Sequence, residues 1–151
     1  MRGTLVCGVD DSGDARRALE TAVGLSDRLG LRLVLAHVRV GIEPIAVNGD
    51  GAESVSMKAS REGAARLLAR LAVEYGVADR AETRFGTGDA AMVIGQIAAE
   101  EAADLIVVGS RARGWLRRGF DSRLAEQLGS ETPVPVLVVP PDGRRTGTMA
   151  A

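Results

Sequence analysis

The sequence contains little of what disulfide, metal or aromatic-stacking chemistry requires. Its 151 residues include one cysteine, Cys7, and one histidine, His37. A single cysteine excludes an internal disulfide, and so few thiol and imidazole ligands argue against a zinc site. Aromatic residues make up 3% of the chain, which is too few for the stacking surfaces that bind single-stranded nucleic acid or a flavin.

Long apolar runs and an excess of one charge are also missing. No run approaches the roughly 20 apolar residues that span a bilayer, and the N-terminal segment has no signal-peptide pattern. Nineteen basic residues face 20 acidic ones, so the net charge of -1 creates no general field to attract nucleic acid. We therefore expect a cytoplasmic protein with neither a membrane nor nucleic acid as a partner.

Short apolar segments alternate along the chain with segments of helical periodicity. Strands are expected at 4–9, 31–38, 81–87, 104–110 and 134–139. Helices are expected at 15–29, 54–75, 92–103 and 121–128. Prolines at 133, 135 and 140 predict that the last strand lies at a sheet edge, because proline cannot donate to a central ladder.

This alternation is typical of an α/β fold, a doubly wound parallel sheet of five strands with helices on both faces. With the strand order 3-2-1-4-5, the winding reverses between the first and fourth strands, and ligands of such sheets bind there. The reversal would bring Asp10, Asp11 and Ser12 close to Gly109, Ser110 and Arg111. We predict one domain over 1–140, a disordered tail over 141–151, and a long loop from Gly41 to Glu53 whose role is open.

Several of these segments together resemble the universal stress protein family. The resemblance is carried, in order, by LVCGVDDS, RRALETA, RLVLAHV, GTGDAA, ADLIVVGSRARG and PVPVLVVP. It implies a Rossmann-like fold of the adenine-nucleotide alpha hydrolase type. It also implies a homodimer through the last strand, and many members bind ATP through a Gly-x2-Gly-x9-Gly-Ser/Thr pattern after the fourth strand.

The chain keeps only the first position of that glycine pattern. Gly109 matches, but Ala112 replaces the second glycine, Ser122 the third, and Arg123 the following Ser/Thr. Glycines allow backbone N–H groups to approach a phosphate that a Cβ would block. Ser122 can still offer a hydroxyl and Arg123 a charged fork to a phosphate. ATP or AMP is therefore a candidate ligand, and the residues favour binding of its nucleoside more than binding of a triphosphate.

The resemblance further implies that Asp10 and the backbone near Val38 meet the base and ribose. The full set of candidate nucleotide-binding residues is Val9, Asp10, Asp11, Ser12, Val38, Gly109, Ser110, Arg111, Ala112, Ser122 and Arg123. Helix capping is an alternative role for Asp10 and the favoured one for Asp11. An ordinary strand exit is the alternative for Gly109 and Ser110.

Other conspicuous residues have simpler interpretations. Cys7 is expected in the core, and His37 in packing or a local hydrogen bond. Gly86-Thr87-Gly88 is expected to be a plain turn, and the arginines of 111–123 a solvated surface. A phospho-receiver domain would need an Asp where Phe85 and Gly86 stand.

We predict a non-catalytic universal-stress-type module that binds an adenine nucleotide between the first and fourth strands and acts in stress response. The alternative is a dimeric interaction protein of the same fold that binds no nucleotide. In either case the apolar edge from Val134 to Val139 predicts a homodimer by strand addition.

Overall fold

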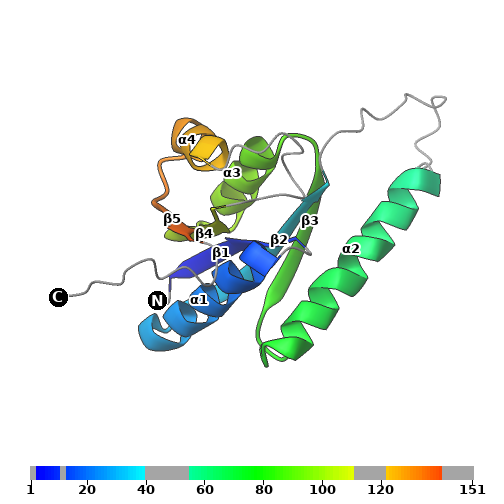
Figure 1. Cartoon of the computed structure of the whole chain (residues 1–151), viewed down its shortest axis with the longest axis horizontal. Coiled ribbons are helices and arrows are strands. Elements are labelled where there is room, and N and C mark those ends of the chain that lie inside the picture. The colour runs from blue at the N-terminus through cyan, green and yellow to red at the C-terminus, as the bar shows by residue number, and fades with distance from the viewer. Residues whose placement is uncertain (1–2, 11–12, 40–54, 111–121, 141–151) are drawn as a thin grey trace, which may run out of the picture.

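Five parallel strands form one sheet with helices on both faces in the computed structural model, which describes residues 3–10, 13–39, 55–110 and 122–140 (Figure 1). The elements are β1 (Thr4–Gly8), α1 (Gly13–Leu29), β2 (Arg32–Arg39), α2 (Val55–Glu74), β3 (Glu82–Thr87), α3 (Ala90–Glu100), β4 (Leu105–Gly109), α4 (Ser122–Glu131) and β5 (Val136–Val139). The strand order is β3-β2-β1-β4-β5, so the predicted doubly wound α/β architecture is confirmed.

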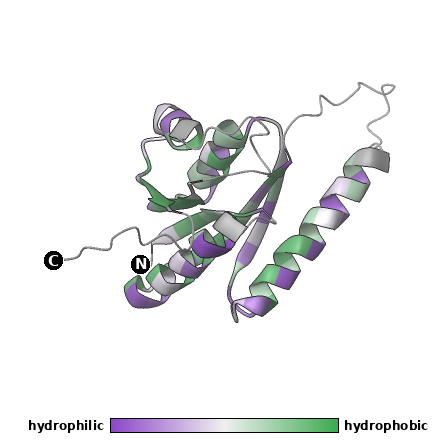
Figure 2. Ribbon diagram, in the orientation of Figure 1, coloured by the Kyte–Doolittle hydropathy of each residue, from purple (hydrophilic) through white to green (hydrophobic). Residues whose placement is uncertain are grey.

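The central strand β1 is buried along its whole length. Leu5 pairs with Leu33 of β2 on one side and with Leu105 of β4 on the other. All five residues of β1 are buried, which suits a continuous run of apolar and β-branched residues between two covered faces. Figure 2 shows the same contrast in colour, with mostly hydrophobic central strands and hydrophilic residues on the outer sides of the helices.

The core consists of two layers, one on each face of the sheet. Leu5, Cys7 and Leu35 pack with Leu19 of α1 and Leu68 of α2 on one face. On the other face the buried residues include Val6, Val34, Ile94 of α3 and Leu128 of α4. Side chains alternate between these layers because successive strand residues point to opposite faces.

Several predicted boundaries were wrong by a few residues. The last strand begins at Val136 rather than 134, because Pro135 has no N–H, although its carbonyl oxygen accepts a hydrogen bond from Ile106 N at 2.9 Å. The third helix ends at Glu100 rather than 103, since Ala102 turns into the left-handed region with φ of 48°. The fourth helix continues to Glu131.

Three sequence predictions lie outside the described residues. These are the loop from Gly41 to Glu53, the tail over 141–151 and most of the arginine-rich segment that follows β4. In the part of the chain that is described, none of the helices combines the length and apolar character needed to cross a bilayer.

Candidate functional site

The carboxyl ends of β1 and β4 meet at the point where the winding of the sheet reverses. Cys7 of β1 pairs with Val107 of β4, and Asp10 and Ser110 each follow that pair by three residues. Strand β1 has β2 on one side and β4 on the other. The helices that follow β1 and β4, α1 and α4, lie on opposite faces of the sheet (Figure 1). The structure thus brings Asp10, Gly109 and Ser110 to the predicted switch point.

The backbone that leads from β1 to Asp10 is fixed by β2. Val9 N donates to Ala36 O at 2.8 Å, and Val9 O lies 2.8 Å from Nδ1 of His37. Because a carbonyl oxygen only accepts, Nδ1 of His37 carries the proton. The predicted local hydrogen bond of His37 is therefore present, and it helps to hold the end of β1 in place.

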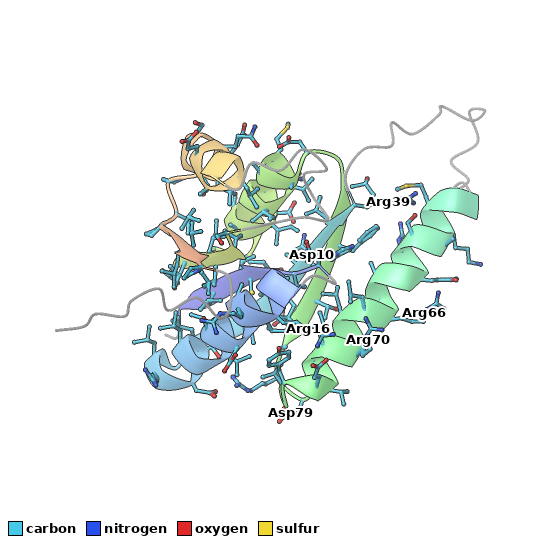
Figure 3. All side chains as sticks on the ribbon, viewed as in Figure 1. Asp10, Arg16, Arg39, Arg66, Arg70 and Asp79 are labelled. Atoms are coloured by element: carbon cyan, nitrogen blue, oxygen red, sulfur yellow. The ribbon has the colours of Figure 1, made fainter. Side chains whose placement is uncertain are left out.

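Asp10 is buried at the end of β1, with 4% of its surface exposed. Figure 3 shows it near the centre of the molecule, at the carboxyl edge of the sheet. A carboxylate is rarely so buried without a specific role, since removing it from water is costly unless polar groups surround it. Val9, directly before it, is fully buried, so of these two candidates Asp10 supplies the polar side chain.

Ser110 is anchored through its backbone but not through its side chain. Its N–H donates to Val139 O of β5 at 2.9 Å. Its Oγ atom is buried and is the one buried side-chain N or O atom of the described residues without a hydrogen-bond partner. A buried hydroxyl without a partner costs roughly 1–3 kcal/mol, so this atom calls for an explanation such as a ligand.

The remaining candidate residues divide into three groups. Val38 is 1% exposed and packs into the layer under α3, so only its backbone can meet a ligand. Ser122 and Arg123 begin α4, but their side chains are not described. Asp11, Ser12, Arg111 and Ala112 lie outside the described residues.

The expectation for Cys7 is confirmed, and the expectation of a plain turn at Gly86-Thr87-Gly88 is wrong for its first two residues. Cys7 is fully buried, and this burial raises the pKa of its thiol far above the usual range. Gly86 and Thr87 belong to β3 and pair with Val38 and Arg39 of β2, and only Gly88, with φ of 123°, lies in the bend that follows. A Cβ on Gly86 would collide with Val93 of α3. Oδ1 of Asp89 accepts from Met92 N at 2.9 Å and caps that helix. Over the described residues no group of three or more metal ligands was found.

Sequence reasoning missed a group of side chains on the α2 face of the sheet. His37 and Arg39 of β2 line a groove with Phe85 of β3 and the early turns of α2. The signal was present as two polar residues at alternate positions beside an aromatic residue. The groove could not be predicted from this signal, because the position of α2 decides whether those side chains are covered.

The sheet places this protein in the class of doubly wound α/β folds, whose ligands bind at the switch point. Here the switch point carries a buried carboxylate, and also a buried hydroxyl that no described residue pairs with. The model of the universal stress protein family matches residues 1–140, and this chain belongs to that family.

Individual relatives agree with this assignment. The "universal stress protein in QAH/OAS sulfhydrylase 3′region" of Thermus aquaticus is 31% identical over 140 residues, covering 92% of this chain and 99% of the relative. A universal stress protein solved with cAMP has a TM-score of 0.68 at 18% identity, covering 91% of this chain and 96% of its own. The Archaeoglobus fulgidus protein solved with dAMP has a TM-score of 0.61 at 19% identity, covering 90% and 96%.

Proposed function

We propose that this protein is a non-catalytic stress-response module that binds an adenine nucleotide at the switch point between β1 and β4. Asp10 and the backbone of Val38 would meet the nucleoside. Gly109, Ser110 and the start of α4 would approach the phosphate, the glycine pattern there being degenerate. On the sequence grounds given above, the cytoplasm is the expected location.

The observation that carries the proposal is the buried Oγ of Ser110. It lies at the end of β4, beside the strand whose end carries the buried Asp10. A hydroxyl can donate to a phosphate or ribose oxygen or accept from a ligand donor. A bound nucleotide would thus satisfy the one buried polar side-chain atom that the described part of the protein leaves without a partner.

The relatives favour a monophosphate at such a site. Two solved universal stress proteins carry cAMP and dAMP, which need fewer phosphate contacts than ATP. Ala112, Ser122 and Arg123 replace the residues that would cradle a longer phosphate chain. We therefore expect AMP to bind at least as tightly as ATP.

Isothermal titration calorimetry with AMP and ATP, with and without magnesium, tests the proposal directly. The triple change Ala112→Gly, Ser122→Gly and Arg123→Ser restores the glycine pattern and should improve ATP binding more than AMP binding. If neither nucleotide binds to the native protein and only the restored variant responds, the proposal fails. The protein is then better studied as a dimeric interaction module.

Ser110→Ala gives a more specific test because two measurements should move in opposite directions. Without ligand, removing an unsatisfied buried hydroxyl should raise the free energy of unfolding by about 1 kcal/mol. AMP affinity should fall about tenfold, the usual effect of losing one ligand hydrogen bond. The control is Ser130→Ala on the exposed side of α4, which should change neither quantity. A Ser110→Ala variant that binds AMP as the native protein does would contradict this role.

We also propose a homodimer formed through the segment from Val134 to Val139. Strand β5 ends the sheet, and Leu137 and Val138 are 38% and 37% exposed. An apolar edge of this kind readily pairs with another strand. The β5 strand of a second copy, related by a two-fold axis, would pair with its free backbone N–H and C=O groups.

A further inference from the structure

A groove lies between α2 and the ends of β2 and β3, away from the switch point. Its volume is about 420 Å³, within the range of roughly 300–1,000 Å³ that holds small ligands. One wall is the early part of α2, where Ala59, Gly63 and Ala64 present almost no side-chain bulk. A Cβ added to Gly63 would meet no atom within 4 Å, so the space beside this wall is open.

The opposite wall combines two rings with a positive charge. His37 and Phe85 are paired across β2 and β3, and their rings lie 15° from parallel with centroids 6.3 Å apart. Arg39 follows His37 on the same side of β2, and Figure 3 shows it at the end of that strand. Other arginines nearby form ion pairs, such as Arg84 with Glu101, but no described residue forms an ion pair or side-chain hydrogen bond with the Arg39 guanidinium.

The described lining of the groove contains no carboxylate. An arginine at the edge of an open groove whose described lining has no acidic residue favours an anion, because its planar fork is suited to carboxylates and phosphates. The rings of His37 and Phe85 favour a planar apolar group beside that anion. The charge of Arg39 and the two rings together favour a ligand that is an aromatic anion.

The groove is separate from the proposed nucleotide site. Val38 points into the core layer under α3, whereas His37 and Arg39, on either side of it, line the groove beside α2. Alternation along β2 therefore places the groove on the opposite face of the sheet from the side chain of Val38. A ligand in the groove would leave the Ser110 side chain untouched, and Asp10 is linked to the groove only through the hydrogen bond from His37 to Val9 O.

We propose that this groove is a second binding site, which takes a small aromatic compound carrying a phosphate or carboxylate group. Arg39 binds the anionic group, the rings of His37 and Phe85 contact the aromatic ring, and the small residues of α2 leave room for it. The described lining of this site contains none of the residues proposed for the nucleotide site.

The probe is phenyl phosphate, and its binding to the full chain is measured by ¹H–¹⁵N NMR. The amide signals of His37, Arg39, Gly63 and Phe85 should shift on titration, and that of Ser110 should not. The Asp10 amide is not used as a reporter, because Nδ1 of His37 donates to the Val9 carbonyl of the same peptide group. Arg39→Gln should weaken binding about tenfold, the effect of losing one charge-assisted contact. Arg28→Gln, on the outer side of α1, is the matched control and should bind as the native protein does.

Two changes at Gly63 test the space itself. Gly63→Leu fills the groove and should abolish the shifts, whereas Gly63→Ala should leave affinity within about twofold of native. Both replacements favour the helix over glycine, so a lower melting temperature is not expected to confuse the result.

Three outcomes would overturn the proposal: no shifts at the groove, equal binding by native and Arg39→Gln protein, or shifts confined to Ser110. Inorganic phosphate as tight as phenyl phosphate would overturn the aromatic part. An AMP titration separates the two proposals. AMP also carries an aromatic ring and a phosphate, so its binding is judged at Ser110 alone. If AMP causes no shift at Ser110 while phenyl phosphate shifts the groove signals, the nucleotide proposal fails and the groove stands.

Discussion

The two edge strands of the sheet, β3 and β5, expose unpaired backbone groups but differ in the side chains that accompany them. Strands β3 and β5 each leave one side of their backbone without a neighbouring strand. On β3, Glu82 and Arg84 carry charges that pair with arginine and glutamate side chains of other elements. On β5, Leu137 and Val138 are partly exposed and no residue from Val136 to Val139 is charged. Figure 2 shows this difference as hydrophilic residues on β3 and hydrophobic colour on β5.

Charge is a usual means of preventing strand addition, because pairing would bury it. The β3 edge is therefore protected, and the β5 edge is left available for a partner. Side-chain chemistry thus sets the two edges apart although their backbone groups are the same: β3 carries charges, and β5 presents the uncharged edge on which the proposed homodimer would form.

The largest effect is expected from Val138→Pro at the β5 edge. Pro135 O and Val139 O accept hydrogen bonds from β4, so the N–H of Val138, out of phase with them, points away from the sheet. Proline removes this outward donor without breaking the β4 ladder. Analytical ultracentrifugation should show the dimer dissociation constant raised at least about a hundredfold, an energy of about 2.7 kcal/mol.

Val138→Thr is the control at the same position, because it keeps the N–H group and nearly the same shape, and it should remain dimeric. A native protein that is monomeric at high concentration would contradict assembly through β5. So would a Val138→Pro variant that dimerises as the native protein does.

A smaller effect is expected at the β3 side, where α3 lies close to the strand. A Cβ on Gly86 would collide with Val93 of α3, so Gly86→Ala should lower the free energy of unfolding by about 1–3 kcal/mol. Gly24→Ala is the matched control: its Cβ meets nothing within 4 Å in the interior of α1, and it should stabilise the protein by about 0.5–1 kcal/mol. Urea denaturation measures both, and equal effects would refute the packing argument.

The smallest effect concerns the charges that protect β3. Arg32 and Arg84 both bind the Glu101 carboxylate, at 2.7 and 2.6 Å, and they lower its pKa from 4.5. Because the folded-state pKa is lowered, the stabilisation is present at neutral pH and is lost as pH falls through that lowered pKa. Glu101→Gln should therefore cost about 1 kcal/mol at pH 7, since both arginines are about one-third exposed and solvent screens the pairs.

That difference should be smaller at pH 3 than at pH 7, because the native carboxylate takes up its proton as pH falls through its lowered folded-state pKa. Urea denaturation at both pH values provides the measurement. Glu126→Gln on α4 is the control, since Glu126 forms no ion pair with any described residue. A Glu101→Gln deficit that is the same at pH 3 and pH 7 would show that charge is not its cause.

Much of this architecture could be predicted from the order of residues along the chain. Apolar runs such as TLVCG and LIVVG indicate strands buried on both faces, and right-handed connections leave few arrangements for five of them. The position of Asp10 beside Ser110 followed from that arrangement. Element ends were less predictable, because Ala102 ends a helix by adopting a left-handed conformation that alanine rarely takes.

The position of the candidate site could be predicted from the sequence, but the hydrogen bonding of its side chains could not. That Ser110 Oγ has no partner depends on which groups surround it in three dimensions. The groove beside Arg39 was not predicted at all, because its second wall belongs to α2, which lies far from β2 in the sequence and close to it only after folding.

The sequence by itself determined the family, the alternation of strands and helices, and the edge position of the proline-flanked last strand. These properties depend on local periodicity and on the missing N–H of proline, which each segment carries with it. Only the tertiary structure decided which polar atoms were left unsatisfied and where open space remained. Burial and hydrogen-bond pairing are properties of neighbours brought together by folding, and local sequence does not specify those neighbours.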